Sequence, residues 1–363
     1  MAESDGPGRD AHPAAVRANR RGKGGATIQD VARVANVSAM TVSRVVNGGS
    51  NVRVATHEAV TAAIASLNYR PNTAARTLAA GEAAQIGLLY ANPSSGYLSR
   101  LLIGALAGTR RAGCHLVVEP CEGDDPADLA GAGRAFAETE VRGVILPPPL
   151  SETAAVRDAL AAANIAWVAI AQGRSDDAGV YPGPGVRIDD FAAARAMTRH
   201  LISLGHSDIA FIGGNLNQTS SRERHRGFVS AIAETGRDPE AIRVEAGDFS
   251  FRSGVLATER LLSAGERPTA IFACNDDMAA AAVGVAHRFG LKVPQEISIV
   301  GFDDTALATS VWPALTTIRQ PIAEMAEVAV AMLVAELRGR GATEDRVLPF
   351  ELVVRDSCAR PPR

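Results

Sequence analysis

The sequence lacks the features that mark a membrane, secreted or disulfide-bonded protein. It contains no run of eighteen apolar residues, so no segment predicts a membrane-spanning helix. Its first 25 residues are polar and lack the apolar core of a secretory signal, so we expect a cytoplasmic protein with no membrane partner. The 4 cysteines show no CxxC motif and no Cys/His pairing of the zinc type, and we expect reduced thiols at Cys114, Cys121, Cys274 and Cys358.

Motifs for catalysis are also missing. There is no P-loop, no GxSxG and no HExxH, and the 7 histidines show no metal-ligand spacing. We therefore expect no metal, no cofactor and no enzymatic activity. Glycoside hydrolysis, which needs only two opposed carboxylates, stays open as an alternative.

Lysine is nearly absent, since 35 of the 37 basic residues are arginine and only Lys23 and Lys292 are lysine. With the abundance of alanine, this skew indicates a compositional bias, so arginine richness alone says little about function. The placement of charge is more informative. Residues 1–80 carry 10 basic and 5 acidic side chains, a net +5, whereas the remainder carries 27 and 35, a net -8. This asymmetry predicts a nucleic-acid-binding segment joined to an acidic body.

The chain has 363 residues, of which 47% are apolar and 21% charged, as in soluble globular proteins of two or three domains. Residues 1–25 have few large apolar side chains and predict a disordered arm. That arm either contacts DNA phosphates or remains a solvated tail.

Residues 27–67 have the apolar spacing of three short helices. Thr27 is placed to cap a first helix over 28–35, and Ser38 to cap a second. Small Ala32 and apolar Val42 allow these two helices to cross closely, as in a helix-turn-helix. The turn residue is Asn36 where glycine is usual, and asparagine tolerates the left-handed conformation.

In that geometry the second helix presents its polar side to DNA. Arg44 can donate two hydrogen bonds to a guanine edge, whereas Ala39 and Met40 can make only apolar contacts, such as with a thymine methyl. Short polar side chains can bind phosphates, here Thr41, Ser43 and Asn47. The alternative is an ordinary helical hairpin with solvated Ser and Thr.

From residue 85 onward, short apolar runs alternate with helical stretches, which predicts parallel sheets covered by helices in two doubly wound halves. The expected strands are Ile86–Tyr90, Leu116–Val118, Val144–Leu146, Trp167–Ile170, Val186–Ile188, Ile209–Ile212, Ala270–Ala273 and Ile297–Val300.

Several motifs in order identify the chain by resemblance. Residues 26–47 (ATIQDVARVANVSAMTVSRVVN) and 67–72 (LNYRPN) resemble the signature and hinge entry of the LacI/GalR family of bacterial transcription regulators. The resemblance continues through Leu204–His206, Ala273–Met278, Gly301–Asp304 and Leu315–Pro321, and so covers nearly everything after residue 26.

The resemblance implies an all-α helix-turn-helix DNA-binding head over 26–71, a hinge helix and linker over 72–81, and an effector-binding and dimerisation domain over 82–363. The last is implied to be an α/β body like the periplasmic-binding-protein type I fold. Its two lobes would be joined by crossovers near 190–205, 315–322 and 346–352.

The resemblance also implies a hinge helix that begins at Asn72 and forms when two subunits lie side by side on a pseudo-palindromic operator. Leu78 would wedge into the minor groove of the double-stranded DNA, with Ala75 beside it. Thr27 and Ser38 belong to the implied DNA-binding set. The chain departs from the family at Arg53, where a serine usually caps the third helix, so we expect Thr56 to cap it.

By motif match, the implied ligand arginine is Arg224, with Asn275, Asp303 and the aromatic Phe249 also contacting the ligand. Asp190 is expected near the site, and Asp277 is a weaker candidate. Tyr97 is expected from the first lobe, although the surrounding residues depart from the family pattern. For Asp189, Asp276 and Asp304 the alternative is helix capping or a surface turn.

We therefore expect a homodimeric, sequence-specific transcriptional repressor whose operator affinity is controlled by a small molecule, first a carbohydrate and then a nucleobase or other metabolite. A periplasmic-type sugar-binding transport protein is the alternative, but it would need a signal peptide and no DNA-binding head. The chain ends without a heptad tail, so we expect no coiled-coil tetramer.

Overall fold

A computed structural model describes residues 27–46, 53–67, 84–121, 131, 134–136, 139–171, 183–238, 242–339 and 345–362. The chain divides into two compact units, Met1–Asn72 and Thr73–Arg363. The expected arm (1–25) and hinge helix (72–81) lie outside the described residues.

The first unit contains three helices, α1 (Ile28–Val34), α2 (Ala39–Val46) and α3 (Val54–Ser66). The caps are those that the sequence predicts. Thr27 forms a capping box with Asp30, and the Ser38 Oγ accepts a hydrogen bond from the Thr41 N–H at 3.1 Å. Asn36 adopts φ 52°, the left-handed conformation expected for the turn.

A small apolar core holds these helices together. The buried side chains come from all three, namely Val31, Ala32, Val42, Val45, Val60 and Ala63. The expected contact of Ala32 with the second helix is therefore present, and the helix-turn-helix is confirmed. The prediction that Thr56 caps the third helix is wrong. Arg53 is extended and begins α3 without a side-chain cap, and its carbonyl accepts hydrogen bonds from Thr56 and His57.

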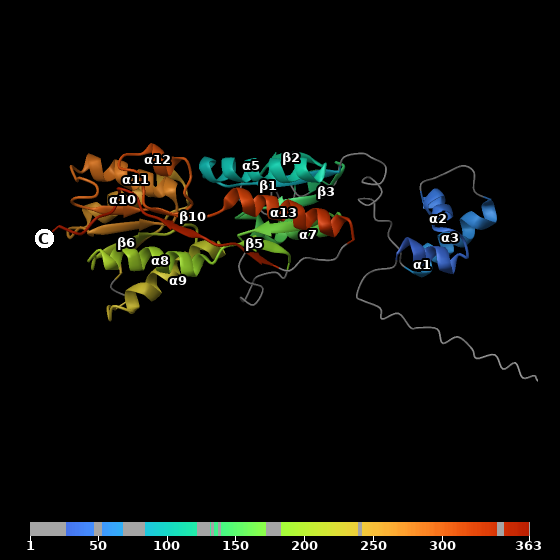
Figure 1. Ribbon diagram of the computed structural model, residues 1–363, viewed down its shortest axis with the longest axis horizontal. Helices are drawn as coiled ribbons and strands as arrows, with labels where there is room; N and C mark the ends of the chain where they lie inside the picture. Colours follow the sequence, from blue (N-terminus) through green and yellow to red (C-terminus); the bar gives the residue numbers. More distant parts are fainter. Residues whose placement is uncertain are drawn as a thin grey trace, which may run out of the picture. The chain divides into compact units, whose positions relative to one another are not determined.

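The second unit consists of two lobes, which Figure 1 shows as two groups of strands and helices. The first lobe has a parallel sheet in the order β11-β5-β4-β3-β1-β2. Its strands are β1 (Gln85–Tyr90), β2 (His115–Pro120), β3 (Val141–Leu146), β4 (Ala166–Ile170), β5 (Gly185–Arg187) and β11 (Arg346–Val347). Its helices are α5 (Ser95–Ala112), the short 3-10 helix η1 (Leu150–Glu152), α7 (Ala154–Ala162) and α13 (Ile322–Leu337).

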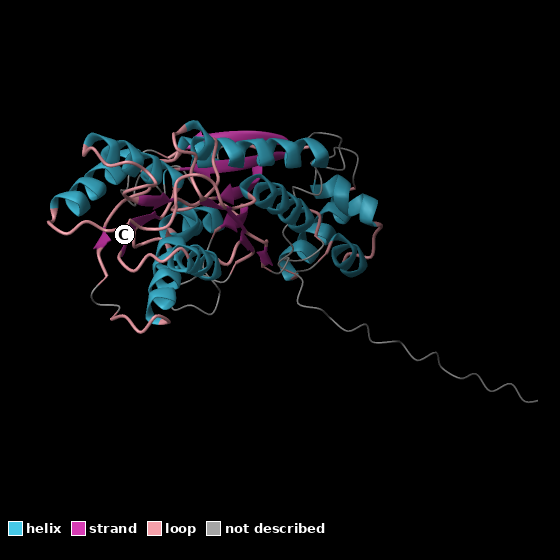
Figure 2. Ribbon diagram, turned by 60° about the vertical axis from the view of Figure 1, so that its left-hand side comes forward, coloured by secondary structure: helices cyan, strands magenta, loops and turns pink. Residues whose placement is uncertain are grey.

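The second lobe has a parallel sheet in the order β7-β6-β8-β9. The strands are β6 (Ile209–Ile212), β7 (Val244–Glu245), β8 (Ala270–Ala273) and β9 (Ser298–Val300). Helices flank the strands of both lobes (Figure 2). Those of the second lobe are α8 (Asp190–Ser203), α9 (Thr219–Ala233), α10 (Phe251–Ser263), α11 (Asp276–Arg288) and the short α12 (Leu307–Ser310).

The chain passes between the lobes after β5, between β9 and α13, and after β11, because β5 and β11 belong to the first sheet and β6 and β9 to the second. β10 (Thr317–Arg319) and β12 (Glu351–Val353) pair antiparallel beside two of these passages. All eight expected strands are present. The short strands β7, β10, β11 and β12 were not predicted; unlike β6 and β8, they include exposed or charged residues and so lack an unbroken apolar run.

Buried apolar runs explain the sheets. Every residue of β6 and β8 is buried, as expected for parallel strands covered on both faces. Phe211 on β6 stacks on Phe228 of α9 at 4.9 Å between ring centroids and meets Phe272 of β8 edge-on at 5.3 Å. No helix in the described ranges is long and apolar enough to cross a membrane.

The strand orders locate the ligand crevice. β1 lies between β2 and β3, and β6 lies between β7 and β8. In each sheet the chain therefore adds its second strand on one side of the first strand and its third strand on the other side, which reverses the direction of winding. In such sheets ligands bind beyond the carboxyl ends of the strands, at the reversal point.

Candidate recognition helix and effector cleft

Helix α2 has one face buried in the core of the head and one face exposed to solvent. Val42 and Val45 are buried, whereas Met40 is 65% exposed and Arg44 is also exposed. One guanidinium nitrogen of Arg44 lies 3.8 Å from the Met40 sulfur, so the two long side chains lie along one face. Ala39, Thr41 and Ser43 are half-buried. Met40 and Arg44 thus have the exposure that base contact requires.

The shorter polar groups are engaged within the head. The Thr27 and Ser38 hydroxyls accept from the Asp30 and Thr41 N–H groups, and the Thr41 hydroxyl lies 2.9 Å from that of Ser38. The remaining expected DNA contacts, Asn47, Asn72, Ala75 and Leu78, lie outside the described residues.

The second unit has a small cleft between its lobes, with a volume of about 30 Å³, which is well below the usual range of small-molecule sites. Its lining follows the carboxyl ends of strands from both sheets. The first lobe contributes Asn92, Ser94, Tyr97, Pro148 and Ala171, and the second contributes Gln218, Ser220, Arg224, Phe249, Asn275 and Asp303.

Arg224 is the centre of a buried polar network. The side chain is on α9 and only about 5% exposed. Its Nε donates to Asp190 Oδ1 at 2.8 Å, and one terminal nitrogen donates to the Cys274 carbonyl at 2.7 Å and lies 3.7 Å from Asp303 Oδ1. The guanidinium also stacks 3.7 Å from the centroid of the Phe302 ring. The group is therefore fixed on several sides before any ligand arrives.

The ionisation of this network follows from its burial. Burial raises the pKa of Asp303 to about 7, although Arg224 opposes the shift, and burial likewise raises the pKa of Asp190. Burial alone would lower the Arg224 pKa, but Asp190 and Asp303 more than offset it, so the pKa of Arg224 lies above its ordinary value. The arginine is a permanent cation with two carboxyl partners.

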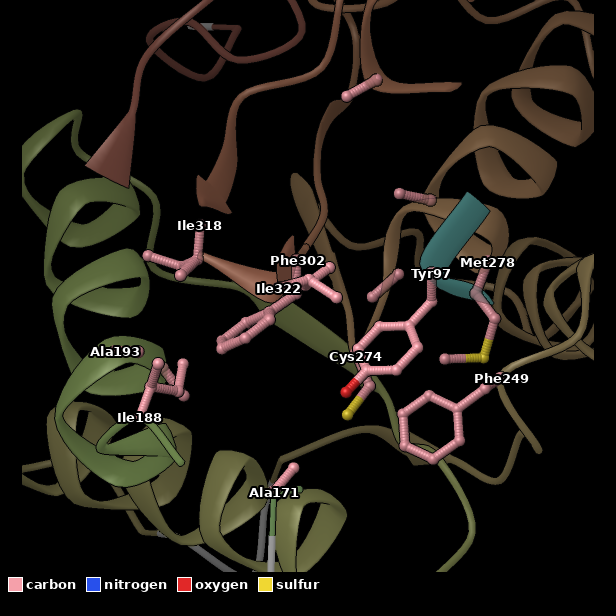
Figure 3. Packing of buried hydrophobic residues seen from close by; sticks show 14 of the residues in the cluster. Tyr97, Ala171, Ile188, Ala193, Phe249, Cys274, Met278, Phe302, Ile318 and Ile322 are labelled. Carbon is pink, nitrogen blue, oxygen red and sulfur yellow. The ribbon is translucent and has the colours of Figure 1, made fainter. Parts of the chain in front are cut away.

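Two aromatic side chains face the cleft from opposite lobes. In Figure 3 the Tyr97 side chain extends from the start of α5 with its hydroxyl directed toward Cys274. Tyr97 is 6% exposed, and its hydroxyl has no hydrogen-bond partner among the residues that the structure describes. A buried hydroxyl without a partner is costly, so this group is available to a ligand.

Asn275 positions the second ring. It caps α11 by accepting from the Met278 N–H at 3.0 Å, and its Nδ2 donates to the Phe249 carbonyl at 2.9 Å. Phe249 has φ 70°, a left-handed conformation that this hydrogen bond helps to hold.

Five of the six expected effector residues line the cleft, and Asp190 lies behind Arg224. Six further residues line the cleft that were not predicted as ligand contacts, namely Asn92, Ser94, Pro148, Ala171, Gln218 and Ser220; their position after strands was the available signal. Of the other acids, Asp189 caps α8 and Asp304 pairs with Arg319 and Arg355. Asp276 accepts from Thr305 and Thr317 in the core.

Side-chain hydrogen bonds join the lobes beside the cleft. The Ser94 hydroxyl donates to Asp277 Oδ2 at 2.6 Å. The Thr219 N–H, at the start of α9, donates to the two carboxylate oxygens of Glu152 at 3.0 and 2.9 Å, and the Thr219 hydroxyl donates to one of them at 3.0 Å. Across the described ranges, no group of three or more His, Cys, Asp or Glu could hold a metal.

Known proteins share both units. Residues 27–72 match the model for bacterial regulatory proteins of the lacI family, and residues 198–358 match a periplasmic binding protein-like domain. The lactose operon repressor of Escherichia coli (strain K12) is 32% identical over 335 residues, which span 92% of this chain and 91% of that one. The chain belongs to the LacI family.

Other known proteins extend the comparison. Catabolite control protein A of Priestia megaterium is 33% identical over 85% of this chain and 91% of its own. A solved complex of the transcriptional regulator CelR with cellobiose has a TM-score of 0.70 and 29% identity over 92% of this chain and 99% of that one. The lac repressor dimer bound to operator and an anti-inducer has a TM-score of 0.68 and 30% identity, over 93% and 100%.

The predicted family, fold class and general function are thereby confirmed. This LacI-family chain is a DNA-binding transcriptional regulator with an effector-binding body, and the alternative of a transport-binding protein is set aside by the helix-turn-helix head.

Proposed function

We propose that the protein is a homodimeric repressor that binds a pseudo-palindromic operator through α2. Its affinity for the operator decreases or increases when a carbohydrate binds between the lobes. The cleft carries this proposal. It combines the carboxyl group of Asp303, which can accept sugar O–H groups, a Tyr97 hydroxyl with no partner among the described residues, and two rings to cover apolar sugar faces.

Relatives support the same assignment. The solved structures include one regulator with cellobiose and one repressor dimer on its operator. In this chain a ligand that contacts both lobes would favour one lobe orientation, and it would change DNA affinity only by its difference in affinity for the two states.

We also propose that the cleft performs no chemistry. A glycoside hydrolase needs two carboxyl groups opposed across the bond to be broken. Asp190 and Asp303 instead lie on the same arginine, and the pair is occupied with Arg224.

The experiment has two parts. A thermal-shift screen of monosaccharides and disaccharides should find ligands that raise the melting temperature of the full chain with concentration. Fluorescence anisotropy on a selected operator should then show that the same ligands change DNA affinity. Stabilisation by nucleobases but by no sugar would contradict the carbohydrate assignment and leave the regulator intact.

Tyr97→Phe provides the matched control for the screen, since it removes only the unpaired hydroxyl. Because a buried hydroxyl without a partner is costly, we expect a slightly higher melting temperature without ligand and a loss of about 1 kcal/mol in sugar binding. Unchanged sugar affinity would show that the hydroxyl makes no ligand contact.

A further inference from the structure

We propose that the cleft admits only uncharged ligands and rejects the phosphorylated form of the sugar that it binds. This inference rests on the proposed function and specifies its ligand class. Three observations carry it: the charge balance at Arg224, the occupation of the surrounding helix N-termini, and the position of Glu152.

The charge of the cleft is already balanced. Arg224 is the one cation among the described residues that line it, and two buried carboxyl groups, Asp190 and Asp303, are within 4 Å of its guanidinium. The three groups sum to zero when Asp303 is protonated and to -1 when it is ionised. A phosphate that left water for this cleft would therefore meet no unmatched positive charge, and desolvation would not be offset.

Helix N-termini are the other common anion sites, because their first N–H groups point outward and carry partial positive charge. Four helices begin at residues that line the cleft or adjoin them. Each start is capped by the protein itself, α5 by Ser94, α8 by Asp189, α9 by Glu152 and α11 by Asn275.

Glu152 is the most informative of these caps because it comes from the opposite lobe, 67 residues before Thr219. Its carboxylate holds both the N–H and the hydroxyl of Thr219, between the cleft residues Gln218 and Ser220. Arg222 donates to the same hydroxyl at 2.7 Å, so a cation also faces this point. A helix N-terminus beside an arginine would bind phosphate, and Glu152 supplies the anion in its place.

An uncharged sugar has the opposite fit. Its hydroxyls can donate to the second carboxyl oxygen of Asp303, whose first oxygen accepts from Gln320, and can accept from Tyr97 without disturbing the charge balance. A phosphate-transfer reaction that used the same sugar would convert it into a product that the regulator does not recognise.

Isothermal titration of matched pairs tests the proposal on the full chain. The probes are glucose with glucose 6-phosphate, galactose with galactose 6-phosphate, and ribose with ribose 5-phosphate. In any pair of which one member binds, we expect the protein to bind the free sugar at least about 100-fold more tightly than its phosphate, a difference of about 2.7 kcal/mol in binding free energy. Equal or tighter binding of a phosphorylated member would overturn the proposal.

Two variants test the cause without requiring the natural sugar. Glu152→Gln frees the start of α9, and Asp190→Asn removes one of the two acidic partners of Arg224 and makes the charge around it more positive by one unit. We expect inorganic phosphate to stabilise both variants against heat and to leave the wild-type chain unaffected. The control is Glu259→Gln, which removes an exposed carboxylate of α10 that pairs with Arg288 of α11, and it should behave as wild type.

The outcomes separate the two proposals. If no sugar of either kind binds, the carbohydrate assignment fails, while phosphate binding gained by Glu152→Gln or Asp190→Asn still supports the charge argument. If folded variants, checked by circular dichroism, reject phosphate as the wild type does, the charge argument is wrong. Phosphate stabilisation of the wild type would also overturn it.

Discussion

Arg44 in the head and Arg224 in the body carry the same guanidinium group in opposite surroundings. Arg44 is exposed on α2, where its described contact is with the sulfur of Met40. Arg224 is buried on α9, with Asp190, the Cys274 carbonyl, Asp303 and the Phe302 ring around it.

The difference reflects two ways of binding. A DNA-reading side chain must reach into a groove and adjust to a base edge, so it is held by little in the free protein. A ligand-binding side chain in a cleft gains by being fixed in advance, because less ordering remains to be done on binding. The skew toward arginine in the composition says nothing about this difference, since the two roles use the same residue type.

Removal of Arg224 should have the largest effect. Arg224→Ala leaves the buried Asp190 and Asp303 without their counter-charge, and we expect the body to lose about 3–5 kcal/mol of unfolding free energy. Chemical denaturation monitored by circular dichroism measures the loss, and ligand response should disappear with it.

Arg224→Lys keeps the positive charge but loses the planar set of N–H donors of the guanidinium. Because the charge is kept, this variant should fold and can be compared with Arg224→Ala. It should retain operator binding and lose most of the ligand response. A normal ligand response in either variant would contradict the role of Arg224 in the cleft.

Removal of Arg44 should have a smaller and more local effect. Arg44→Ala should leave the melting temperature unchanged, because the side chain is exposed, and should cost about 1–3 kcal/mol at the guanine that it reads. Binding-site selection followed by sequencing measures the preference at each operator position. Wild-type specificity in the selected sites would refute the assignment, and Arg33→Ala on α1, an exposed arginine paired with Asp30, is the matched control.

The same comparison shows what the sequence could predict. The strands were readable because parallel strands covered on both faces are unbroken apolar runs, as at Ile209–Ile212 and Ala270–Ala273. Asn275 and Asp303 were readable because they follow such runs, whereas Arg224 lies within α9 and was indicated only by its match to a family motif. Glu152 was not, because its partner Thr219 is far along the chain and belongs to the other lobe. Nor did any pattern indicate that Asn275 uses its amide to hold Phe249.

The pH dependence of the body should separate the buried network from the exposed head. The pKa of Asp303 is raised to about 7, so its contribution to stability is complete below the ordinary carboxyl range and is lost as pH rises through about 7. We expect a lower melting temperature at about pH 8 than at about pH 6. Asp303→Asn, which cannot ionise, should show a smaller difference between the two, whereas an equal difference would mean that another group titrates.

Loss of the cap on α1 should have the smallest effect and be confined to the head. Thr27→Ala removes the hydroxyl that accepts from the Asp30 N–H, and we expect a cost of about 1 kcal/mol, because an orphan N–H at a helix start is left to water. Thr27→Ser keeps the hydroxyl and is the control. Hydrogen exchange on the full chain should show faster exchange in α1 for Thr27→Ala only, with no change in α9. If both variants exchange alike, the capping box contributes nothing to the head, and its small core alone holds α1 in place.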